Sequence, residues 1–355
     1  MRMRTAISTR SSVRNLKRPS YGTVPEGIVR MNDNSNLFMP NPAAERVARE
    51  FDFDSLSEYP PLAADGLREA IGRKLKASPE QVIVGNGSDE IIDLVVKAYC
   101  DPDDRAMIPV PTFEMYSMYL AIAGARIVMC PLKEDFQLDA ERMLSTRAKM
   151  IFIASPNNPT GNSMREEDVL RIVEESGALT VIDEAYCEFA GGSRYTRLVD
   201  EYENVIVLRT FSKAYALSGL RVGFGIASEG IVEAIRRVEP PFRLNRFSEQ
   251  VAIEALKDDD FISRTVRMAR KERAWLSNEL ELMGAEVYPS ETNFILFRSP
   301  MAVKKLISGL LKRKIAIRDC SNQPMLRNCA RVTFGRHEMN SRFVSEMRSV
   351  IGGSR

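Results

Sequence analysis

The chain has 355 residues, of which 44% are hydrophobic and 28% charged, and its formal net charge is +2. This composition is ordinary for a soluble globular protein, and the small net charge favours neither a nucleic acid nor a strongly acidic partner. His337 is the only histidine, which nearly excludes histidine-based metal sites and Ser-His-Asp triads, so we expect no bound metal.

We predict a basic arm over residues 1–30. The first 25 residues have no acidic side chain, and their basic residues lie among Ser and Thr; they are Arg2, Arg4, Arg10, Arg14, Lys17 and Arg18. A transit peptide has a similar composition. The plainer interpretation is a flexible basic arm. The five cysteines are dispersed without a Cys-x-x-Cys pair, which is typical of reduced thiols in the cytoplasm, where we place the protein. Because no apolar run approaches the length of a membrane span, we expect no membrane association.

Short apolar runs alternate with helical patterns from residue 64 to residue 226. The apolar runs predict seven strands, at Gln81–Val84, Arg105–Val110, Arg126–Cys130, Met150–Ala154, Thr180–Ile182, Val205–Leu208 and Arg221–Ile226. The helical patterns lie at Ala64–Lys76, Ser88–Tyr99, Phe113–Ala123, Asp139–Ser145 and Arg165–Ser176. This alternation predicts an α/β domain over residues 31–260 with a mostly parallel sheet. Consecutive runs with no helix between them leave room for a mixed sheet.

A second, smaller α+β domain is predicted over residues 261–355. It begins with a long helical stretch, Phe261–Met283, which we take as the bridge between the domains. The remaining elements are expected at Asn293–Arg298 (strand), Ala302–Arg313 (helix), Ile315–Arg318 (strand), Arg331–Phe334 (strand) and Glu338–Val350 (helix).

Lys213 and Asp183 carry the strongest chemical signal. Lys213 lies just beyond one predicted strand, and Asp183 closes another, thirty residues upstream. Pyridoxal phosphate (PLP) chemistry needs this pair of groups. A lysine amine forms a Schiff base with the cofactor aldehyde, and a carboxylate keeps the pyridine nitrogen protonated so that the ring accepts electrons.

A phosphate site is predicted where Gly85-Asn-Gly-Ser-Asp-Glu90 opens a helix. Glycine lets the backbone approach an anion, and the free N–H groups of the helix start bind it. Ser88 would add its hydroxyl and Asp89 its backbone N–H, with Ser212 and Arg221 completing the site. A plain helix cap would have the same residues. The glycines of Gly219–Gly225 precede or lie within an apolar run, whereas a dinucleotide motif follows a strand and opens a helix, so we disfavour nicotinamide binding.

The loop Ser155-Pro-Asn-Asn-Pro-Thr-Gly161 follows the strand Met150–Ala154 directly. A simple turn would explain its prolines and glycine. Asn158 could donate its amide to the cofactor 3-hydroxyl, and Tyr186, three residues after Asp183, could do the same with its phenol. Two donors to that oxygen stabilise its anionic form and lower the proton affinity of the neighbouring imine.

Taken together, these motifs resemble the fold-type I PLP-dependent aminotransferases and, within them, the histidinol-phosphate aminotransferases. The matching runs are Ser155–Gly161, Asp183-Glu-Ala-Tyr186, Arg209-Thr-Phe-Ser-Lys-Ala214 and Ala216-Leu-Ser-Gly-Leu-Arg221. Weaker matches are Tyr59-Pro60, Gly87–Glu90, Pro111–Tyr116, Ser290–Phe294, Arg318-Asp-Cys320 and Arg331–Gly335. The resemblance implies an aspartate-aminotransferase-like large domain with a mixed seven-stranded sheet. It also implies transamination of histidinol phosphate with 2-oxoglutarate, in histidine biosynthesis.

The resemblance also assigns roles to individual residues. Lys213, Asp183 and Tyr186 are implied as catalytic. The cofactor is implied to contact Gly87, Ser88, Asp89, Phe113 (stacked on the ring), Asn158, Asp183, Tyr186, Ser212, Lys213, Arg221 and, from the neighbouring subunit, Tyr59. A homodimer with shared active sites follows from that last assignment. Substrate contacts are implied for Arg331, which would fork onto a carboxylate or phosphate, for Tyr21 of the arm, and for Asn34.

Two segments depart from the pattern of that family. Ser35 stands where the family usually has Glu, and Pro240–Arg246 replaces a stretch that usually carries Asn-Val-Asn after the aromatic residue. Arg243 of this second segment either faces solvent or enters the pocket. We predict it as a substrate contact, in which case Arg243→Ala would weaken binding of phosphorylated substrates more than of neutral ones.

Three other functions fit the sequence less well. An aromatic or other amino-acid aminotransferase of the same group would use the same catalytic residues. A threonine-phosphate decarboxylase is similar over Arg318–Asn322, whereas the arm residues Arg14–Lys17 resemble the transaminase. A non-catalytic sensor with this fold would not need intact Lys213, Asp183 and Arg221.

Overall fold

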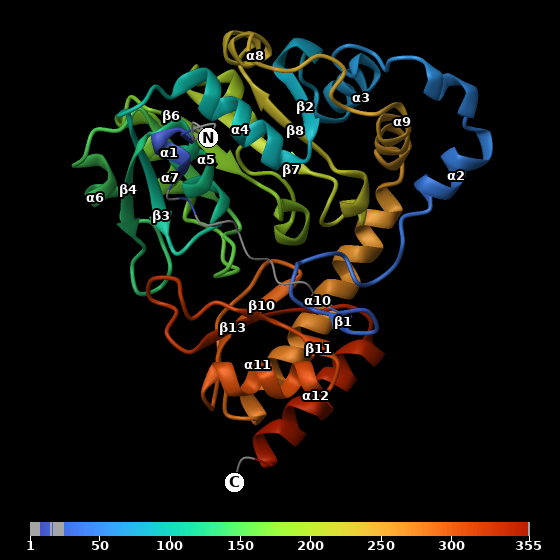
Figure 1. The fold of residues 1–355 in the computed structure, drawn as a ribbon, viewed down its shortest axis with the longest axis vertical. Coiled ribbons are helices and arrows are strands. Elements are labelled where there is room, and N and C mark those ends of the chain that lie inside the picture. Colours follow the sequence, from blue (N-terminus) through green and yellow to red (C-terminus); the bar gives the residue numbers. More distant parts are fainter. Residues whose placement is uncertain (1–7, 15, 17–24, 354–355) are drawn as a thin grey trace, which may run out of the picture.

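A seven-stranded sheet forms the centre of the larger part of the molecule in the computed structural model, which describes residues 8–14, 16 and 25–353 (Figure 1). Its strands are β2 (Val82–Asn86), β3 (Arg105–Val110), β4 (Arg126–Pro131), β5 (Met150–Ala154), β6 (Leu179–Asp183), β7 (Val205–Thr210) and β8 (Val222–Ala227). Their spatial order is β2-β8-β7-β6-β5-β3-β4. All neighbours are parallel except β8, which runs antiparallel to β2 and β7. The predicted mostly parallel, mixed seven-stranded sheet is therefore confirmed.

Helices cover both faces of this sheet, as the continuous apolar runs of its strands require. One apolar core contains residues of α3 (Asp65–Leu75), α6 (Ala140–Leu144), α7 (Glu166–Glu175) and α9 (Arg246–Ala255). The core on the opposite face contains residues of α4 (Ser88–Tyr99), α5 (Met115–Ala123) and α8 (Glu229–Arg236). Successive strand residues alternate between the cores, so that Ile151 joins the first and Phe152 the second.

The C-terminal part is built on a four-stranded antiparallel sheet and three helices. The strand order is β12-β13-β10-β9, with β9 (Glu286–Val287), β10 (Phe294–Arg298), β12 (Arg318–Asp319) and β13 (Cys329–Thr333). The helices are α10 (Asp259–Leu282), α11 (Val303–Lys312) and α12 (His337–Gly352). In Figure 1, α10 leads from the larger part down into this sheet, and α11 and α12 lie below it.

The segment before the large sheet belongs partly with the C-terminal part. The strand β1 (Val29–Arg30) pairs in parallel with β11 (Ile315–Ala316), and Asn293 of the C-terminal part donates to the backbone oxygen of Asn34 at 3.1 Å. The helix α1 (Ser11–Arg14) lies against α5, where Ser12 Oγ donates to the oxygen of Ile122 at 3.0 Å. The division into an arm (1–30), a large domain (31–260) and a small domain (261–355) stays a prediction.

The structure differs from the predicted elements in several places. The strand expected at Ile315–Arg318 is two strands, because β11 pairs with β1 while β12 pairs with β13. Among the described residues, four α-helices were not expected, namely α1, α2 (Ala43–Glu50), α8 and α9. In the part of the chain that the structure describes, no helix is both long and apolar enough to span a membrane.

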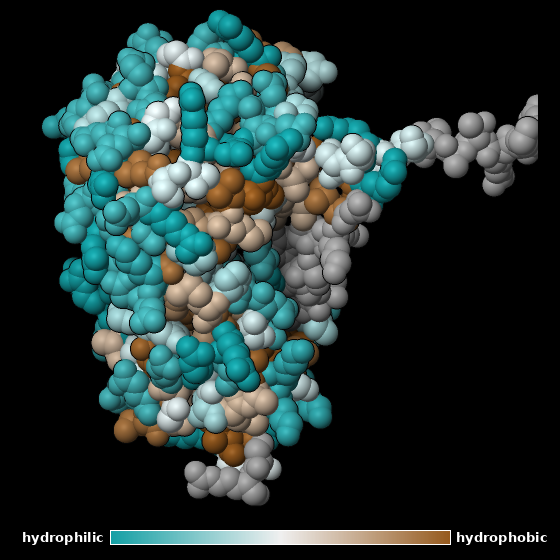
Figure 2. All heavy atoms as spheres, turned by 90° about the vertical axis from the view of Figure 1, so that its left-hand side faces the viewer, coloured by the Kyte–Doolittle hydropathy of each residue, from teal (hydrophilic) through white to brown (hydrophobic). Residues whose placement is uncertain are grey.

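Strand β4 forms one edge of the large sheet. Its Met129 side chain is exposed. Figure 2, which shows the left-hand side of Figure 1, has hydrophilic side chains over most of this face and hydrophobic ones in patches between them.

Candidate active site

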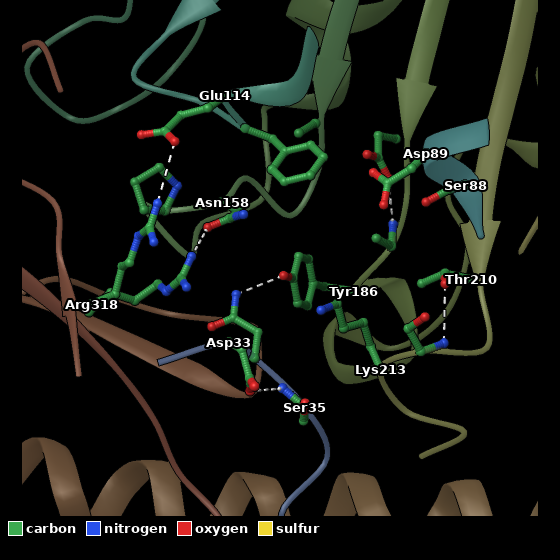
Figure 3. A pocket seen from close by; sticks show the side chains of 18 of the residues that line it. Asp33, Ser35, Ser88, Asp89, Glu114, Asn158, Tyr186, Thr210, Lys213 and Arg318 are labelled. Carbon is green, nitrogen blue, oxygen red and sulfur yellow. Dashed lines mark hydrogen bonds and ion pairs between the residues drawn. The ribbon is translucent and has the colours of Figure 1, made fainter. Parts of the chain in front are cut away.

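A cavity of about 300 Å³ lies where the carboxyl ends of the parallel strands meet the C-terminal sheet. The loops after β2, β3, β5, β6 and β7 line one side of it, and β12 and β13 contribute Arg318 and Arg331 from the other (Figure 3). Ligands bind at this end of open α/β sheets because loops from several strands converge there. Of the residues predicted at the cofactor, all except Tyr59 line this cavity.

Lys213 follows β7 and points into the cavity. Its Nζ lies 5.6 Å from the centroid of the Tyr186 ring. The loop that carries it is held next to the strand end, because the Ser212 backbone N–H donates to Thr210 Oγ1 at 3.1 Å. The amine is therefore placed on a short, anchored loop, which is the arrangement that a covalent cofactor lysine needs.

Asp183 is the last residue of β6, and it is buried with its carboxylate directed at the same cavity. Its Oδ2 accepts from the Tyr116 hydroxyl at 2.6 Å, and its Oδ1 accepts from the Ala185 backbone N–H at 3.0 Å. Burial raises the pKa of Asp183 despite these two hydrogen bonds. A cation held against the carboxylate would reverse that effect, and a protonated ring nitrogen is such a cation.

The predicted phosphate site is a cup around the start of α4. Gly87 has φ +78°, and a Cβ there would lie 2.6 Å from Arg221 Nη2, so only glycine fits. Arg221 Nη2 lies 3.2 Å from Asp89 Oδ2, and its Nη1 lies 3.5 Å from Ser212 Oγ. The cup thus combines N–H groups of a helix start, two hydroxyls and a guanidinium, which is the chemistry of an anion site.

Gly223 lets the strand β8 lie directly against this cup. A Cβ at Gly223 would lie 2.2 Å from the backbone nitrogen of Ser88 and 2.5 Å from the carbonyl carbon of Gly87. Any side chain there would displace the phosphate-binding backbone.

Asn158 and Arg331 form a direct contact across the cavity. Arg331 Nη1 donates to Asn158 Oδ1, which leaves the amide nitrogen of Asn158 to face the cavity. Arg331 Nη2 donates to the backbone oxygen of Asn32 at 2.8 Å, and its buried Nε has no protein partner among the described residues. Burial lowers the pKa of Arg331. A buried guanidinium with an unused donor is suited to an anionic substrate group.

The other predicted residues have different surroundings. Phe113 lines the cavity and packs edge to face on Tyr116, with ring centroids 5.5 Å apart. Tyr59 does not line the cavity; it is 78% exposed and stacks on Phe242. Asn34 lines the cavity, but its amide binds Tyr186. Tyr21 lies outside the described residues.

Arg243 lies outside the cavity, which corrects the prediction that it contacts substrate. Its guanidinium is 7% exposed and bridges two carboxylates, with Nη1 at 3.0 Å from Glu90 Oε2 and Nη2 at 2.5 Å from Glu239 Oε2. It does not face solvent either. To reach a substrate it would have to leave both carboxylates unpaired.

We therefore expect Arg243→Ala to lower stability without altering substrate choice. Removing one partner leaves Glu90 and Glu239 as poorly paired, largely buried charges, so the free energy of unfolding should fall by about 2–3 kcal/mol. The ratio of kcat/KM for phosphorylated and neutral amino donors should be unchanged. Arg237→Ala, at a 74% exposed side chain paired with Glu233, is the control and should change stability by less than about 0.5 kcal/mol. A change in this ratio of kcat/KM values would mean that Arg243 does contact the substrate.

Among the cavity residues that were not singled out individually from the sequence, three join different elements at the site. Tyr116 donates to Asp183 from α5, a contact between elements far apart in the sequence. Arg318 Nη2 lies 3.4 Å from Glu114 Oε2, which joins the two sides of the cavity (Figure 3). Tyr116, Glu114 and Arg318 all stand inside runs that matched the family, Pro111–Tyr116 and Arg318–Cys320, so the signal was present without a role attached to it.

The residues of the cavity fit PLP. The cavity brings together four groups: the Lys213 amine, the buried carboxylate of Asp183, the anion cup and the amide of Asn158. Because burial raises the pKa of Asp183, a cation beside it would stabilise its charged form. These are the groups that would hold an aldehyde, a protonated ring nitrogen, a phosphate and a ring hydroxyl.

Comparisons with known proteins agree with this geometry. The family model "Aminotransferase class I and II" matches residues 26–347. Histidinol-phosphate aminotransferase from Methanocaldococcus jannaschii is 38% identical over 343 residues, which cover 94% of this chain and 91% of that protein. The crystal structure of histidinol-phosphate aminotransferase from Clostridium acetobutylicum has a TM-score of 0.86 at 27% identity, covering 92% of this chain and 100% of that one. That from Sinorhizobium meliloti, in complex with pyridoxal-5'-phosphate, has a TM-score of 0.90 at 23% identity and covers 100% of both chains.

Proposed function

Because the chain belongs to the class I and II aminotransferases, which are PLP-dependent enzymes acting on small molecules, we propose that it transfers the amino group of histidinol phosphate to 2-oxoglutarate. The products would be imidazole acetol phosphate and glutamate, and the reaction would serve histidine biosynthesis in the cytoplasm. The observation that carries the proposal is the placement of Arg331 and Arg318 in the cavity that holds Lys213 and Asp183. Two guanidiniums suit a substrate with a phosphate and a co-substrate with two carboxylates. The similarity to histidinol-phosphate aminotransferases over more than nine tenths of the chain supports it.

Each cavity residue has a defined task in this reaction. When bound, PLP supplies an aldehyde to which amines attach and a ring that withdraws electrons from the substrate's α-carbon. Lys213 would bind the aldehyde, and its amine, when not bonded there, is the base that takes the α-proton. The carboxylate of Asp183 would keep the ring nitrogen protonated. Arg331 would orient the substrate through its phosphate or carboxylate.

The remaining residues hold the cofactor in place. Ser88, Ser212, Arg221 and the N–H groups at Gly87 and Asp89 would bind its phosphate. Phe113 would stack on one face of the ring. Asn158 and Tyr186 would donate to its 3-hydroxyl, which stabilises negative charge on that oxygen.

The test is a single-turnover absorbance experiment on the PLP-loaded enzyme with four amino donors added separately. Histidinol phosphate should convert the cofactor rapidly to its amine form. Glutamate should cause the same conversion more slowly, and 2-oxoglutarate should reverse it. Conversion by aromatic amino acids alone would make the protein a general aromatic aminotransferase. Release of carbon dioxide from threonine phosphate, with the original spectrum restored, would make it a decarboxylase instead.

The enzyme is further proposed to act as a homodimer with shared active sites. Four large apolar side chains between residues 53 and 62 are more than half exposed, and a second copy would cover such a surface; they are Phe53, Leu56, Tyr59 and Leu62. Tyr59 would then reach the phosphate cup of the partner subunit, since it does not line the cavity of its own chain.

We expect two inactive variants to complement each other if the sites are shared. Each shared site takes Lys213 from one subunit and Tyr59 from the other. In a hybrid of a Tyr59→Ala subunit and a Lys213→Ala subunit, one site therefore has both substitutions and the other site has neither. Mixing the two variants under conditions of subunit exchange should therefore restore activity to as much as half of the parent value per hybrid. Activity no greater than the sum of the separate variants, or a monomer in sedimentation equilibrium, would refute the shared site.

A further inference from the structure

Asn34 contacts a catalytic residue of the proposed function. The side chain is buried, with 2% of its surface exposed, and its Nδ2 donates to the Tyr186 phenol oxygen at 2.8 Å. In Figure 3 this contact is the dashed line that ends on the hydroxyl of Tyr186. A residue in this position acts on the reaction through Tyr186.

Thr333 of β13 determines which way the amide of Asn34 points. Its Oγ1 accepts from the backbone N–H of Asn34 at 3.0 Å, and its own hydrogen is donated to Asn34 Oδ1 at 3.2 Å. Thr333 is fully buried, so water does not compete for that hydrogen. Because Oδ1 faces a donor, the amide nitrogen must be the atom that faces Tyr186.

The backbone of Asn34 is also held in place. The residue has φ 59°, in the left-handed region that asparagine tolerates better than most residues. Its carbonyl oxygen accepts from Asn293 Nδ2 at 3.1 Å. The loop therefore presents the amide to Tyr186 from a fixed position.

The hydrogen of the Tyr186 hydroxyl is consequently turned towards the cavity. The phenol oxygen already accepts the hydrogen of Asn34, so its own hydrogen must point elsewhere. No protein acceptor takes that hydrogen among residues 8–14, 16 and 25–353, and Tyr186 lines the cavity in which the cofactor is expected.

We propose that Asn34 is a positioning residue which, held by Thr333, directs the Tyr186 hydrogen at the 3-oxygen of the cofactor and so lowers the affinity of the lysine–cofactor linkage for its proton. The proposal rests on the proposed function, because it requires PLP bound at Lys213. A donor to the 3-oxygen stabilises negative charge there and weakens that oxygen's hold on the proton it shares with the linkage nitrogen. It also gives Asn34 a different role from the substrate contact expected from the sequence.

The other charged and titratable groups around Tyr186 come from several elements. Those that line the same cavity are Lys213, Asp183 at the end of β6, Tyr116 of α5, Asp89 of α4, Arg221 before β8, Arg331 of β13, Arg318 of β12, Cys320, Glu114, Arg30 of β1 and Asp33. None of these groups is removed when only Asn34 is replaced, so a change in the proton affinity reports on the Asn34–Tyr186 contact.

The experiment is a pH titration of the cofactor absorbance in the loaded enzyme without substrate. Asn34→Ala should raise the midpoint by on the order of half to one pH unit, the equivalent of one weakened hydrogen bond. Thr333→Val keeps the side-chain volume and should shift the midpoint in the same direction, which also covers the case that Asn34→Ala fails to fold. Asn41→Ala is the matched control: this buried asparagine donates to the backbone oxygen of Tyr215 at 2.8 Å and should leave the midpoint unchanged.

A double-mutant cycle separates positioning from a general structural effect. If Asn34 acts through Tyr186, Asn34→Ala should add no further shift in a Tyr186→Phe variant. An unchanged midpoint in both Asn34→Ala and Thr333→Val, or an equal shift in the Tyr186→Phe background, would overturn the proposal. Failure of histidinol phosphate to react would defeat the proposed substrate and leave this titration unaffected, so the two outcomes are distinguishable.

Discussion

Replacing Lys213 by alanine should abolish turnover, with kcat reduced by about 10⁴-fold or more. The variant loses the amine that binds the cofactor and, with it, the base that takes the α-proton, and one positioned base alone is worth up to about 10⁴-fold. The cavity should still bind PLP without a covalent bond, because the anion cup and Asp183 are separate from Lys213. Borohydride reduction followed by mass spectrometry should find the cofactor attached to residue 213 in the parent and unattached in the variant.

Two lysine substitutions sharpen this test. Lys213→Arg keeps a positive charge but cannot form the covalent bond, so it should be as inactive as alanine. Lys97→Ala removes an exposed lysine of α4 that pairs with Asp93, and it should keep full activity and full labelling. Labelling that persists in Lys213→Ala would mean that another lysine binds the cofactor.

Replacing Asp183 by asparagine should reduce kcat/KM by roughly 10³-fold while leaving the fold intact. The buried carboxylate is the group that would hold the ring nitrogen protonated, and loss of one such preorganised electrostatic group typically costs about 10²–10³-fold. Asparagine has the same shape, and its single amide oxygen can still accept from the Ala185 N–H, while its amide nitrogen would face the Tyr116 hydroxyl and donate to it. Steady-state kinetics together with the dissociation constant for PLP would show whether Asp183→Asn impairs the chemical step or cofactor binding.

Two further variants distinguish charge from shape at this position. Tyr116→Phe removes the 2.6 Å hydrogen bond but keeps the carboxylate charge, so its effect should stay within about tenfold. Asp183→Glu keeps the charge at a changed distance and should be less damaging than Asp183→Asn. If Asp183→Asn kept more than a tenth of the parent kcat/KM, the carboxylate would not be essential to the ring.

Much of the large sheet could be predicted from the sequence because its strands are buried on both faces. Runs such as Met150–Ala154 have no polar residue, which is typical of a parallel strand that is covered on both faces. The positions of Lys213, Asp183 and Asn158 followed from the same strands, since a residue at a carboxyl end of a parallel strand must lie at the ligand-binding edge. The residue types and their positions at the strand ends both predicted a site at the carboxyl edge of the sheet.

The contacts that sequence reasoning missed join elements far apart in the chain. Arg243 was expected in the pocket, but its position depends on Glu239 one turn earlier and on Glu90 of α4, and only the packed structure brings Glu90 to it. The split of Ile315–Arg318 into two strands depends on β1, nearly three hundred residues upstream. Hydrophobic periodicity reports which side of an element is buried, not which element covers it.

The pairing of Gly223 with its neighbouring strands sets the distance between the phosphate cup and Lys213. Since β8 pairs with both β2 and β7, Gly223 lies opposite Gly85 on one side and Thr210 on the other. Gly87 comes two residues after Gly85, and Lys213 comes three residues after Thr210. The pairing of these three strands at Gly223 therefore sets the distance between the phosphate cup and the lysine. Because a side chain at Gly223 would displace the cup and Thr210 anchors the loop of Lys213, the length of cofactor that the site accepts depends on backbone packing as well as on the residues that perform the chemistry.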